Sequence, residues 1–421
     1  MELQIDYGRD GLVIKVPESA AVLKMTESQP LSDEGKAIRE ALSNPIGKPP
    51  LSSLVDSATS VVITHSDITR ATPNDRILPV LLQFLEEYGV RREKITLINA
   101  LGTHRPQTPD EMRSLLGDYI YSHYRCIQHN AFDDSELVPV GRTSFGNEIR
   151  LNKTLLEANL KIFTGFIEPH FFAGFSGGPK AVLPALAGFE SVYSNHGYKH
   201  ISSPSATFTV THGNPIWEEM RQAAEKVENT FLLNVTLDRS RRITGVFAGD
   251  VIPAHEEGCK FQKAKSVVKI EEPFDIVITS NSGYPLDQNL YQCVKGLSAA
   301  KRAVRKGGAI LLAARCEDGL PSHGKYAALL EQGRTPEGIL NMINKAGFIS
   351  QDSWQVQVQA YVQQHADVFI YSEGLSDFQI RCAMMNPVRD INSAIKDLQK
   401  KYGKRICVIP EGPLVVVNQH S

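Results

Sequence analysis

The chain has few cysteines, and it lacks any arrangement of them that would build a structural site. Six cysteines are spread over 421 residues, and no two of them form a Cys-x-x-Cys pair. Disulfide scaffolds and zinc ribbons need closely spaced cysteines, so reduced thiols are expected instead. There is also no apolar run of about 18 residues, the length that a membrane-spanning helix requires. The N-terminus has neither the basic region nor the apolar stretch of a secretory signal. We therefore expect a cytoplasmic protein with no membrane partner.

An excess of charge of one sign is absent as well. Lysine and arginine total 45 and aspartate and glutamate total 47, which gives a formal net charge of -2. Proteins that bind nucleic acid usually carry a basic excess, so nucleic acid is not expected as a partner. Hydrophobic residues make up 42% of the chain, enough for a sizeable core. At roughly 150 residues per domain, the length predicts two domains.

Apolar segments alternate with amphipathic ones along the first half of the chain. Strands are expected at 60–64, 94–101 and 158–167, and a helix at 74–90. In the next helix, at 108–117, Thr108 and Glu111 have the spacing of a capping box. Strands that alternate with helices predict a largely parallel sheet covered by helices on both faces.

The second half repeats the pattern after a hairpin. The segments 230–238 and 241–249 are expected to form that hairpin, and KIEEPF at 269–274 is expected to be a linker. Further strands and helices are then expected in this order: 275–283, 288–306, 309–314, 336–347, 353–366, 388–402 and 405–410. We predict two α/β domains with largely parallel sheets, residues 1–270 and 271–421, with the active site in the cleft between them.

Four polar segments follow expected strands directly, at 66–73, 101–109, 168–180 and 280–296. In open α/β sheets, ligands bind outside the carboxyl ends of the strands, so loops at that edge can converge on one site. Each loop alone is also compatible with ordinary turn chemistry. Four such loops together favour a functional site.

The first two loops carry charged and titratable side chains. Asp67 and Arg70 place a carboxylate and a guanidinium close together, and a guanidinium suits a bidentate grip on a carboxylate or phosphate. An N-cap aspartate beside a solvated arginine is the alternative. His104 lies in Gly-Thr-His-Arg-Pro, where glycine and proline limit the loop's freedom. A histidine held in this way suits proton transfer, although a lone histidine is more often structural.

The third loop, Glu-Pro-His-Phe-Phe-Ala-Gly-Phe-Ser-Gly-Gly-Pro-Lys at 168–180, is the densest in polar and glycine residues. Its backbone amides, with a helix expected to start near Lys180, predict an anion site. It is not a Walker A loop, because Pro179 precedes the lysine and Ala181 follows it. The three phenylalanines of the loop suggest a compact apolar wall around a small pocket: Phe171, Phe172 and Phe175.

The same loop formally matches the Gly-x-Ser-x-Gly nucleophile elbow. A serine hydrolase with Ser176 as nucleophile is therefore the main alternative. The elbow needs a strand that runs straight into the serine, yet Glu-Pro-His-Phe-Phe intervenes. Neither His323 nor His365 has a setting that marks it as the partner. A nucleotide-binding or cofactor-carrying protein without turnover is a third possibility.

Two further groups of residues complete the candidate site. His196 lies in Ser-Asn-His-Gly. Together with His104 and His170, which lie on other loops, it could form a transition-metal site, although no His-Glu-x-x-His motif exists. Tyr291 and Lys295, four residues apart, share one face of an expected helix. Trp354 suits an aromatic wall of the pocket, with core packing as its alternative.

Taken together, these motifs resemble the nickel-dependent lactate racemase family, the nickel-pincer nucleotide racemases and epimerases of 2-hydroxy acids. The likeness runs over nearly the whole length. It is carried by Asp-x-Thr-Arg, Gly-Thr-His-Arg-Pro, Glu-Pro-His…Ser-Gly-Gly-x-Lys, Asn-His-Gly and Tyr-Gln-x-x-Lys. These motifs contribute Asp67, Thr69, Arg70, His104, His170, Lys180, His196, Tyr291, Gln292 and Lys295.

The resemblance implies a cofactor that contains nickel. This nickel-pincer nucleotide, a pyridinium-3-thioamide-5-thiocarboxylic acid mononucleotide, would be attached covalently to Lys180, and His196 would be the protein ligand of the nickel. The resemblance also implies cofactor-biosynthesis proteins as maturation partners. The remaining cofactor-binding residues would be Asp67, Thr69, Ser176, Gly177 and Gly178.

It implies an isomerase that inverts a small 2-hydroxy acid by reversible hydride transfer from C2. His104 and His170 would alternate as base and acid. Substrate would be bound by Arg70, Tyr291, Gln292, Lys295 and Trp354. Lactate is the leading substrate, while malate, longer aliphatic or aromatic hydroxy acids and sugar acids stay open. Nothing in the sequence determines the oligomeric state.

Overall fold

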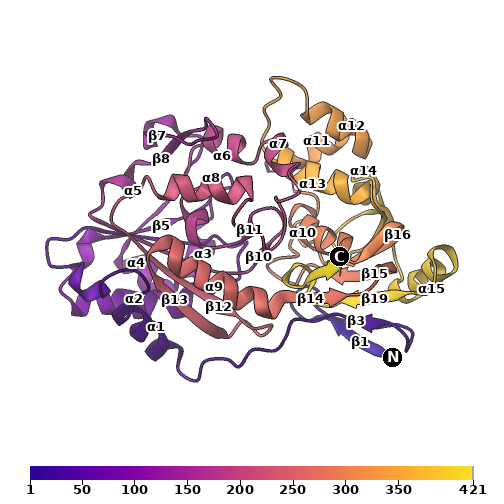
Figure 1. The fold of residues 1–421 in the computed structure, drawn as a ribbon, viewed down its shortest axis with the longest axis horizontal. Coiled ribbons are helices and arrows are strands. Elements are labelled where there is room, and N and C mark those ends of the chain that lie inside the picture. The colour runs from indigo at the N-terminus through magenta and orange to yellow at the C-terminus, as the bar shows by residue number, and fades with distance from the viewer. Residues whose placement is uncertain (322, 420–421) are drawn as a thin grey trace.

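The structure is a computed structural model that describes residues 1–321 and 323–419. Two six-stranded sheets, each covered by helices, lie side by side (Figure 1). The first sheet and its helices, here the first unit, occupy the indigo and magenta side of the ribbon. The second sheet and its helices, here the second unit, occupy the orange and yellow side. The α/β class with largely parallel sheets is confirmed.

The first sheet has the order β13-β12-β9-β4-β5-β6. All neighbouring pairs are parallel except β12 and β13, which form the expected hairpin. Val61 and Ile63 pack into one hydrophobic cluster and Val62 into another, so the sheet is buried on both faces as parallel sheets are. The strands are β4 (Val61–His65), β5 (Ile95–Asn99), β6 (Arg125–Gln128), β9 (Leu160–Phe166), β12 (Thr230–Leu237) and β13 (Ile243–Gly249).

The helices of the first unit begin where the sequence provides caps. Thr108 caps α3 through the predicted capping box with Glu111. Asn214 caps α8, which has proline at its first turn. The helices are α1 (Glu34–Ser43), α2 (Asn74–Glu87), α3 (Pro109–Leu116), α4 (Asp118–His123), α5 (Lys153–Glu157), α6 (Phe189–Asn195), α7 (Tyr198–Ile201), α8 (Pro215–Ala224) and α9 (Val251–Ser266).

The second sheet has the order β18-β17-β16-β15-β19-β3 and is entirely parallel. Its strands are β3 (Ala21–Val22), β15 (Phe274–Ser280), β16 (Val304–Ala313), β17 (Asp367–Tyr371), β18 (Asn386–Val388) and β19 (Ile406–Ile409). Its helices are α10 (Leu290–Lys301), α11 (Tyr326–Gly333), α12 (Pro336–Ile343), α13 (Ser353–Gln363), α14 (Asp377–Cys382) and α15 (Ile391–Tyr402).

Four two-stranded sheets complete the fold. One of them, β10 with β11, carries the third polar loop. The pairs are β1 (Glu2–Ile5) with β2 (Leu12–Lys15), β7 (Leu137–Arg142) with β8 (Glu148–Asn152), β10 (Pro169–His170) with β11 (Gly174–Phe175), and β14 (Val267–Ile270) with β20 (Val416–Gln419). No helix among residues 1–321 and 323–419 is long and apolar enough to cross a membrane.

Two local predictions differ from the structure. The helix expected to start near Lys180 is only a 3₁₀ turn, Gly178–Ala181. Proline at 184 lacks the amide hydrogen that a continuing helix needs, and it disfavours helical geometry at the residue before it. The expected linker at 269–274 instead begins within β14, because this strand pairs with β20 near the end of the chain.

The N-terminal segment also crosses between the two units. Strand β3 pairs with β19, and the β1–β2 hairpin packs on the second sheet through Ile5 and Ile14. In Figure 1 the N-terminus accordingly lies beside the second unit. One hydrophobic cluster continues from the first unit into the second, from Phe172 to Val294 and Trp354. The division at residue 270 stays a prediction.

Candidate active site

The polar loops converge on one cavity between the two units. The cavity has a volume of about 140 Å³ and is lined by the ends of β4, β5 and β9 and by α10 and α13. Of the residues predicted to act in catalysis or to bind the cofactor, the substrate or the metal, all but Thr69 and Gly178 line it. Those that do are Asp67, Arg70, His104, His170, Ser176, Gly177, Lys180, His196, Tyr291, Gln292, Lys295 and Trp354.

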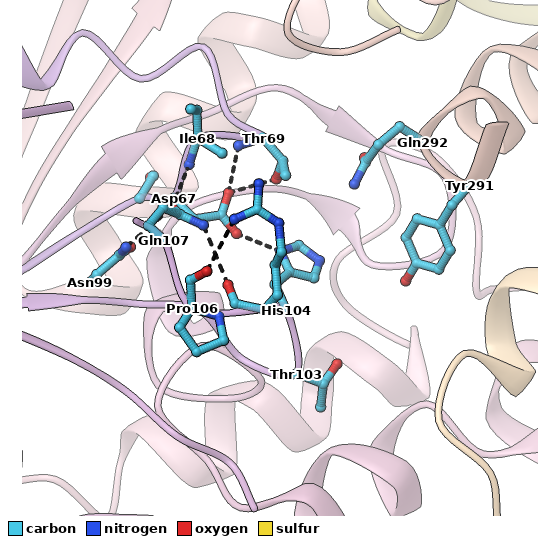
Figure 2. Close-up of polar contacts among 12 residues, drawn as sticks. Asp67, Ile68, Thr69, Asn99, Thr103, His104, Pro106, Gln107, Tyr291 and Gln292 are labelled. Carbon is cyan, nitrogen blue, oxygen red and sulfur yellow. Dashed lines mark hydrogen bonds and ion pairs between the residues drawn. The ribbon is translucent and has the colours of Figure 1, made fainter. Parts of the chain in front are cut away.

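Asp67, which is buried, and His104, which is partly exposed, form a pair at one side of this cavity. The Asp67 carboxylate bonds Nδ1 of His104 through one oxygen, and its other oxygen accepts from the backbone and hydroxyl of Thr69 at 2.9 and 2.6 Å. Figure 2 shows the pair, with Tyr291 and Gln292 across from it. Burial alone would raise the pKa of Asp67, but His104, Arg70 and Thr69 outweigh it and lower the pKa. The aspartate stays ionised and fixes His104 with Nε2 free to accept a proton.

His170 is held differently. Its Nδ1 accepts from the backbone N–H of Ala173 at 3.2 Å, so the neutral ring carries its proton on Nε2. Burial lowers the pKa of His170 well below its usual value, and the nearby cations Lys180, Lys295 and Arg70 lower it further. The cavity thus contains one histidine whose Nε2 is free to accept a proton and one whose Nε2 carries a hydrogen and can donate a hydrogen bond.

The glycine-rich turn places Lys180 in the cavity. The backbone N–H of Gly178 donates to Oδ1 of Asn234 at 2.8 Å, and Nε2 of His255 donates to the carbonyl of Ser176 at 2.9 Å. Burial, followed by Arg70 and Lys295, holds the pKa of Lys180 well below its usual value. The amine is therefore more nucleophilic at neutral pH than that of a surface lysine.

His196 is oriented by a chain of buried polar side chains. Its Nδ1 donates to Oδ1 of Asn195 at 2.9 Å. The amide nitrogen of Asn195 donates to Glu219 at 2.9 Å and to the carbonyl of Ile216 at 3.1 Å, which fixes which way the amide faces. Burial, followed by Lys180, lowers the pKa of His196 to about 3. The ring is therefore neutral, with an unprotonated Nε2 that suits a metal ligand.

Helices α10 and α13 supply the opposite wall. The indole N–H of Trp354 donates to the hydroxyl of Tyr291 at 3.2 Å, and its ring meets His196 edge-on with centroids 5.4 Å apart. Nζ of Lys295 donates to Gln292 at 2.7 Å. Burial, followed by Arg70, lowers the pKa of Lys295 to about 7. Trp354 is thus both buried and part of the cavity wall.

The cavity suits an anionic ligand. Arg70 and Lys295 lie close enough to Lys180 and His170 to lower the pKa of both, and Arg70 also lowers the pKa of Lys295. Nη1 of Arg70 and the hydroxyl of Thr64, which both belong to the lining, are buried without a hydrogen-bond partner. Such buried groups are costly unless a ligand satisfies them. Among the residues that the structure describes, no group of three or more His, Cys, Asp or Glu side chains could hold a metal.

The serine hydrolase alternative finds little support in this geometry. The hydroxyl of Ser176 lies 3.4 Å from a carboxylate oxygen of Glu168. The nearby His255 donates to the backbone carbonyl of Ser176 and not to its hydroxyl. A nucleophile elbow also needs a strand that leads straight into a helix. Here Ser176 follows the two-residue strand β11 and precedes a 3₁₀ turn.

Some supporting residues were not found from the sequence. Asn195 directly precedes His196 in the Asn-His-Gly motif, so its role had a local signal. Three further supporting residues come from distant elements, and nothing in their local sequence marks them. They are Glu219 on α8, Asn234 on β12 and His255 on α9. Phe175, expected in the pocket wall, instead packs with Ile167 and Cys259, whereas Phe171 and Phe172 do line the cavity.

Comparison with known proteins identifies the family. Residues 7–209 match the model of the lactate racemase N-terminal domain, and residues 269–417 match that of the lactate racemase C-terminal domain. The chain is 34% identical over 425 residues to a lactate racemase of Thermoanaerobacterium thermosaccharolyticum, with 99% of each chain covered. The chain belongs to the lactate racemase family.

Further relatives agree with membership of the lactate racemase family. A lactate racemase of Lactiplantibacillus plantarum is 36% identical over 387 residues, 91% of each chain. The lactate racemase apoprotein structure from T. thermosaccharolyticum superposes with a TM-score of 0.91 at 33% identity, covering 99% of this chain and 100% of that one. A Thermotoga maritima protein, 20% identical with a TM-score of 0.73 over 94% of this chain and all of its own, shares the fold. This chain is an isomerase of the racemase class.

Proposed function

We propose that this chain interconverts the enantiomers of a small 2-hydroxy acid, with lactate as the favoured substrate, by using a nickel-pincer nucleotide held on Lys180. The single observation that carries the proposal is the pairing of Lys180 and His196 in one cavity. One is a lysine whose pKa is depressed, and the other is a buried histidine whose Nε2 lone pair is available. The names of the two curated relatives support lactate as the substrate.

The residues of the cavity fit such a cofactor. Lys180 has the nucleophilic amine that a covalent link needs, and His196 would be the protein ligand of the nickel. The positive surroundings and the unpartnered Nη1 of Arg70 favour an anionic group. Asp67 and Thr69 would act by orienting His104, while the Ser176–Gly178 turn would hold the nucleotide. When bound, the cofactor supplies a hydride acceptor for C2 of the substrate.

The side chains would carry out the remaining steps. Arg70 and Lys295 would bind the substrate carboxylate, and Nε2 of His104 would take the proton from the substrate hydroxyl. His170, entering as the imidazolium with Nδ1 released from the Ala173 N–H, would give a proton from Nε2 to the substrate oxygen on the opposite side, so that the two histidines exchange protonation states in each turnover. Anions bound beside Arg70 and Lys295 would relieve the repulsion that lowers the pKa of His170. Tyr291, Gln292 and Trp354 would shape the pocket and exclude water.

The reaction is tested by incubating the purified holoprotein with single enantiomers of lactate, malate and longer 2-hydroxy acids, followed by chiral chromatography. We expect lactate to approach an equal mixture of enantiomers from either side. The same protein should contain stoichiometric nickel and carry a mass adduct on Lys180. A protein from a competent host with neither nickel nor adduct would contradict the cofactor assignment.

A further inference from the structure

A second cavity lies behind the phenylalanines of the active site. It has a volume of about 320 Å³, and Phe171 and Phe172 line both cavities. Its other walls come from residues 201–208 of the first unit and from α10 and α13 of the second. Because these elements belong to different units, anything bound there contacts both.

One end of this cavity is cationic. Lys301, the last residue of α10, lines it, with Nζ 5.7 Å from the centroid of the Tyr361 ring. Among the residues that the structure describes, Lys301 has no carboxylate partner, and the lining contains no aspartate or glutamate. Arg302 lines the same end and is held in place by donating to the carbonyl of Val417 at 2.8 Å and to the hydroxyl of Thr207 at 3.1 Å. Burial, followed by Arg302, lowers the pKa of Lys301.

The rest of the lining is hydroxyl-bearing or apolar. Hydroxyls of Ser202 and Tyr361 lie 2.8 Å apart, and Gln357 donates to both, at 3.0 and 3.1 Å. The hydroxyl of Ser202 can therefore turn between partners inside the protein and a ligand. The apolar wall consists of Phe171, Phe172, Ile201, Phe208, Val358 and Val362.

We propose that this cavity is a second ligand site that binds a small organic carboxylate, with Lys301 holding the carboxylate and the apolar wall holding the hydrocarbon part. A half-buried ammonium without an acidic partner favours an anion. An apolar wall of six side chains gives no advantage to a fully hydrophilic anion such as inorganic phosphate, whereas it favours a carboxylate with a short carbon chain.

The two helices that line this second cavity also line the active site, so a ligand bound here contacts elements that carry active-site residues. Helix α10 carries Lys295 and Lys301, and α13 carries Trp354 and Tyr361. A ligand that contacts residues 201–208 as well as both helices stabilises the docked arrangement of the two units. This site is distinct from the substrate position proposed above and does not depend on racemase activity.

The test is brief acetylation of the full chain without cofactor, followed by peptide mapping. Propionate, L-lactate or inorganic phosphate is added at constant ionic strength. We expect propionate and lactate to slow acetylation of Lys301 by about ten-fold at ten times their dissociation constant, as simple occupancy requires. Lys396, exposed on α15, is the internal control and should react at an unchanged rate.

Two variants locate the effect. In Arg70→Gln, which removes the carboxylate-binding arginine of the active site, protection of Lys301 should persist. In Lys301→Gln, the rise in thermal midpoint caused by propionate should be lost, whereas Lys396→Gln should retain it. Loss of protection in Arg70→Gln would assign it to the active site and overturn the proposal. Absence of protection in the wild type, or equal protection by phosphate, would also overturn it.

Discussion

The orientation of His196 depends on one neighbouring side chain, which makes Asn195 the most informative position to change. In Asn195→Ala, Nδ1 of His196 loses its acceptor and the ring loses its fixed tautomer. We expect the affinity for nickel to fall by about 10- to 100-fold, as for other outer-sphere partners of metal ligands. Nickel per chain after dialysis measures this. Asn344→Ala, at an exposed helix end, is the control and should retain nickel fully.

If Lys295 binds the substrate carboxylate as proposed, its charge gives the reaction a pH dependence of defined sign. A lysine is charged below its pKa, and burial lowers that of Lys295 to about 7. Its attraction for a substrate carboxylate should therefore weaken as the pH rises. We expect KM to increase up to about ten-fold between about pH 6 and about pH 8, following the charged fraction. In Lys295→Arg, which stays charged, this rise should vanish. The same rise in both enzymes would place the titrating group elsewhere.

The turn that precedes Lys180 has room only for glycine. Gly178 has φ of +55°, and a Cβ atom there would lie 2.3 Å from Cγ of His255. The matched position is Gly347, with φ of +77° and nothing within 4 Å of a Cβ. Gly347→Ala should lose about 1–2 kcal/mol of unfolding free energy from backbone strain alone. Gly178→Ala should lose about 1–3 kcal/mol more, from the clash with a fixed ring.

Urea denaturation of the two variants measures this difference. The contrast between them isolates the steric contribution of His255, since both positions share the left-handed backbone. Equal losses would show that the His255 ring moves aside without cost. The turn would then not depend on α9 for its conformation.

The loops were predictable from the sequence because their chemistry is local. A strand, a polar turn and a capped helix each leave a pattern within about ten residues, as in β4, the loop around Asp67 and α3 with its capping box. The likeness to a family then joined loops that are distant in sequence. A helix was expected to start near Lys180 because strands and helices alternate along this part of the chain, whereas the structure has only a 3₁₀ turn there.

What the sequence did not reveal depends on contacts between distant segments. His255 and Asn234 hold the glycine-rich turn from α9 and β12, and no local pattern marks a residue that acts from so far away. Strand β3 is only two residues long, and it joins the second sheet by pairing with β19. Pairing across nearly 400 residues follows from tertiary packing, which periodicity does not report.

The two units are held together by side chains as well as by the shared hydrophobic cluster. Gln351 of the second unit donates to the carbonyl of Thr103 at 2.8 Å, in the loop that carries His104. Gln357 donates to the carbonyl of Tyr198 and to the hydroxyl of Ser202, at 3.0 Å each. These contacts tie α13, which carries Trp354, to the segment after His196, and tie the residues just before α13 to the His104 loop. The geometry of the candidate active-site cavity therefore depends on how the units dock.

Removal of Gln357 should loosen this docking without unfolding either unit. In Gln357→Ala, the carbonyl of Tyr198 and the hydroxyl of Ser202 lose the amide that reaches them from α13, while Ser202 keeps its bond to Tyr198 and its contact with Tyr361. Each hydrogen bond lost should remove about 0.5–1.5 kcal/mol. We expect faster hydrogen exchange in both α7 and α13. Gln363→Ala is the matched control on the same helix, because the hydrogen bonds of Gln363 within the described residues go to Gln359, Ala383 and Met384, all of the second unit. There the faster exchange should stay within the second unit. An identical exchange pattern in the two variants would show that α13 does not couple the units.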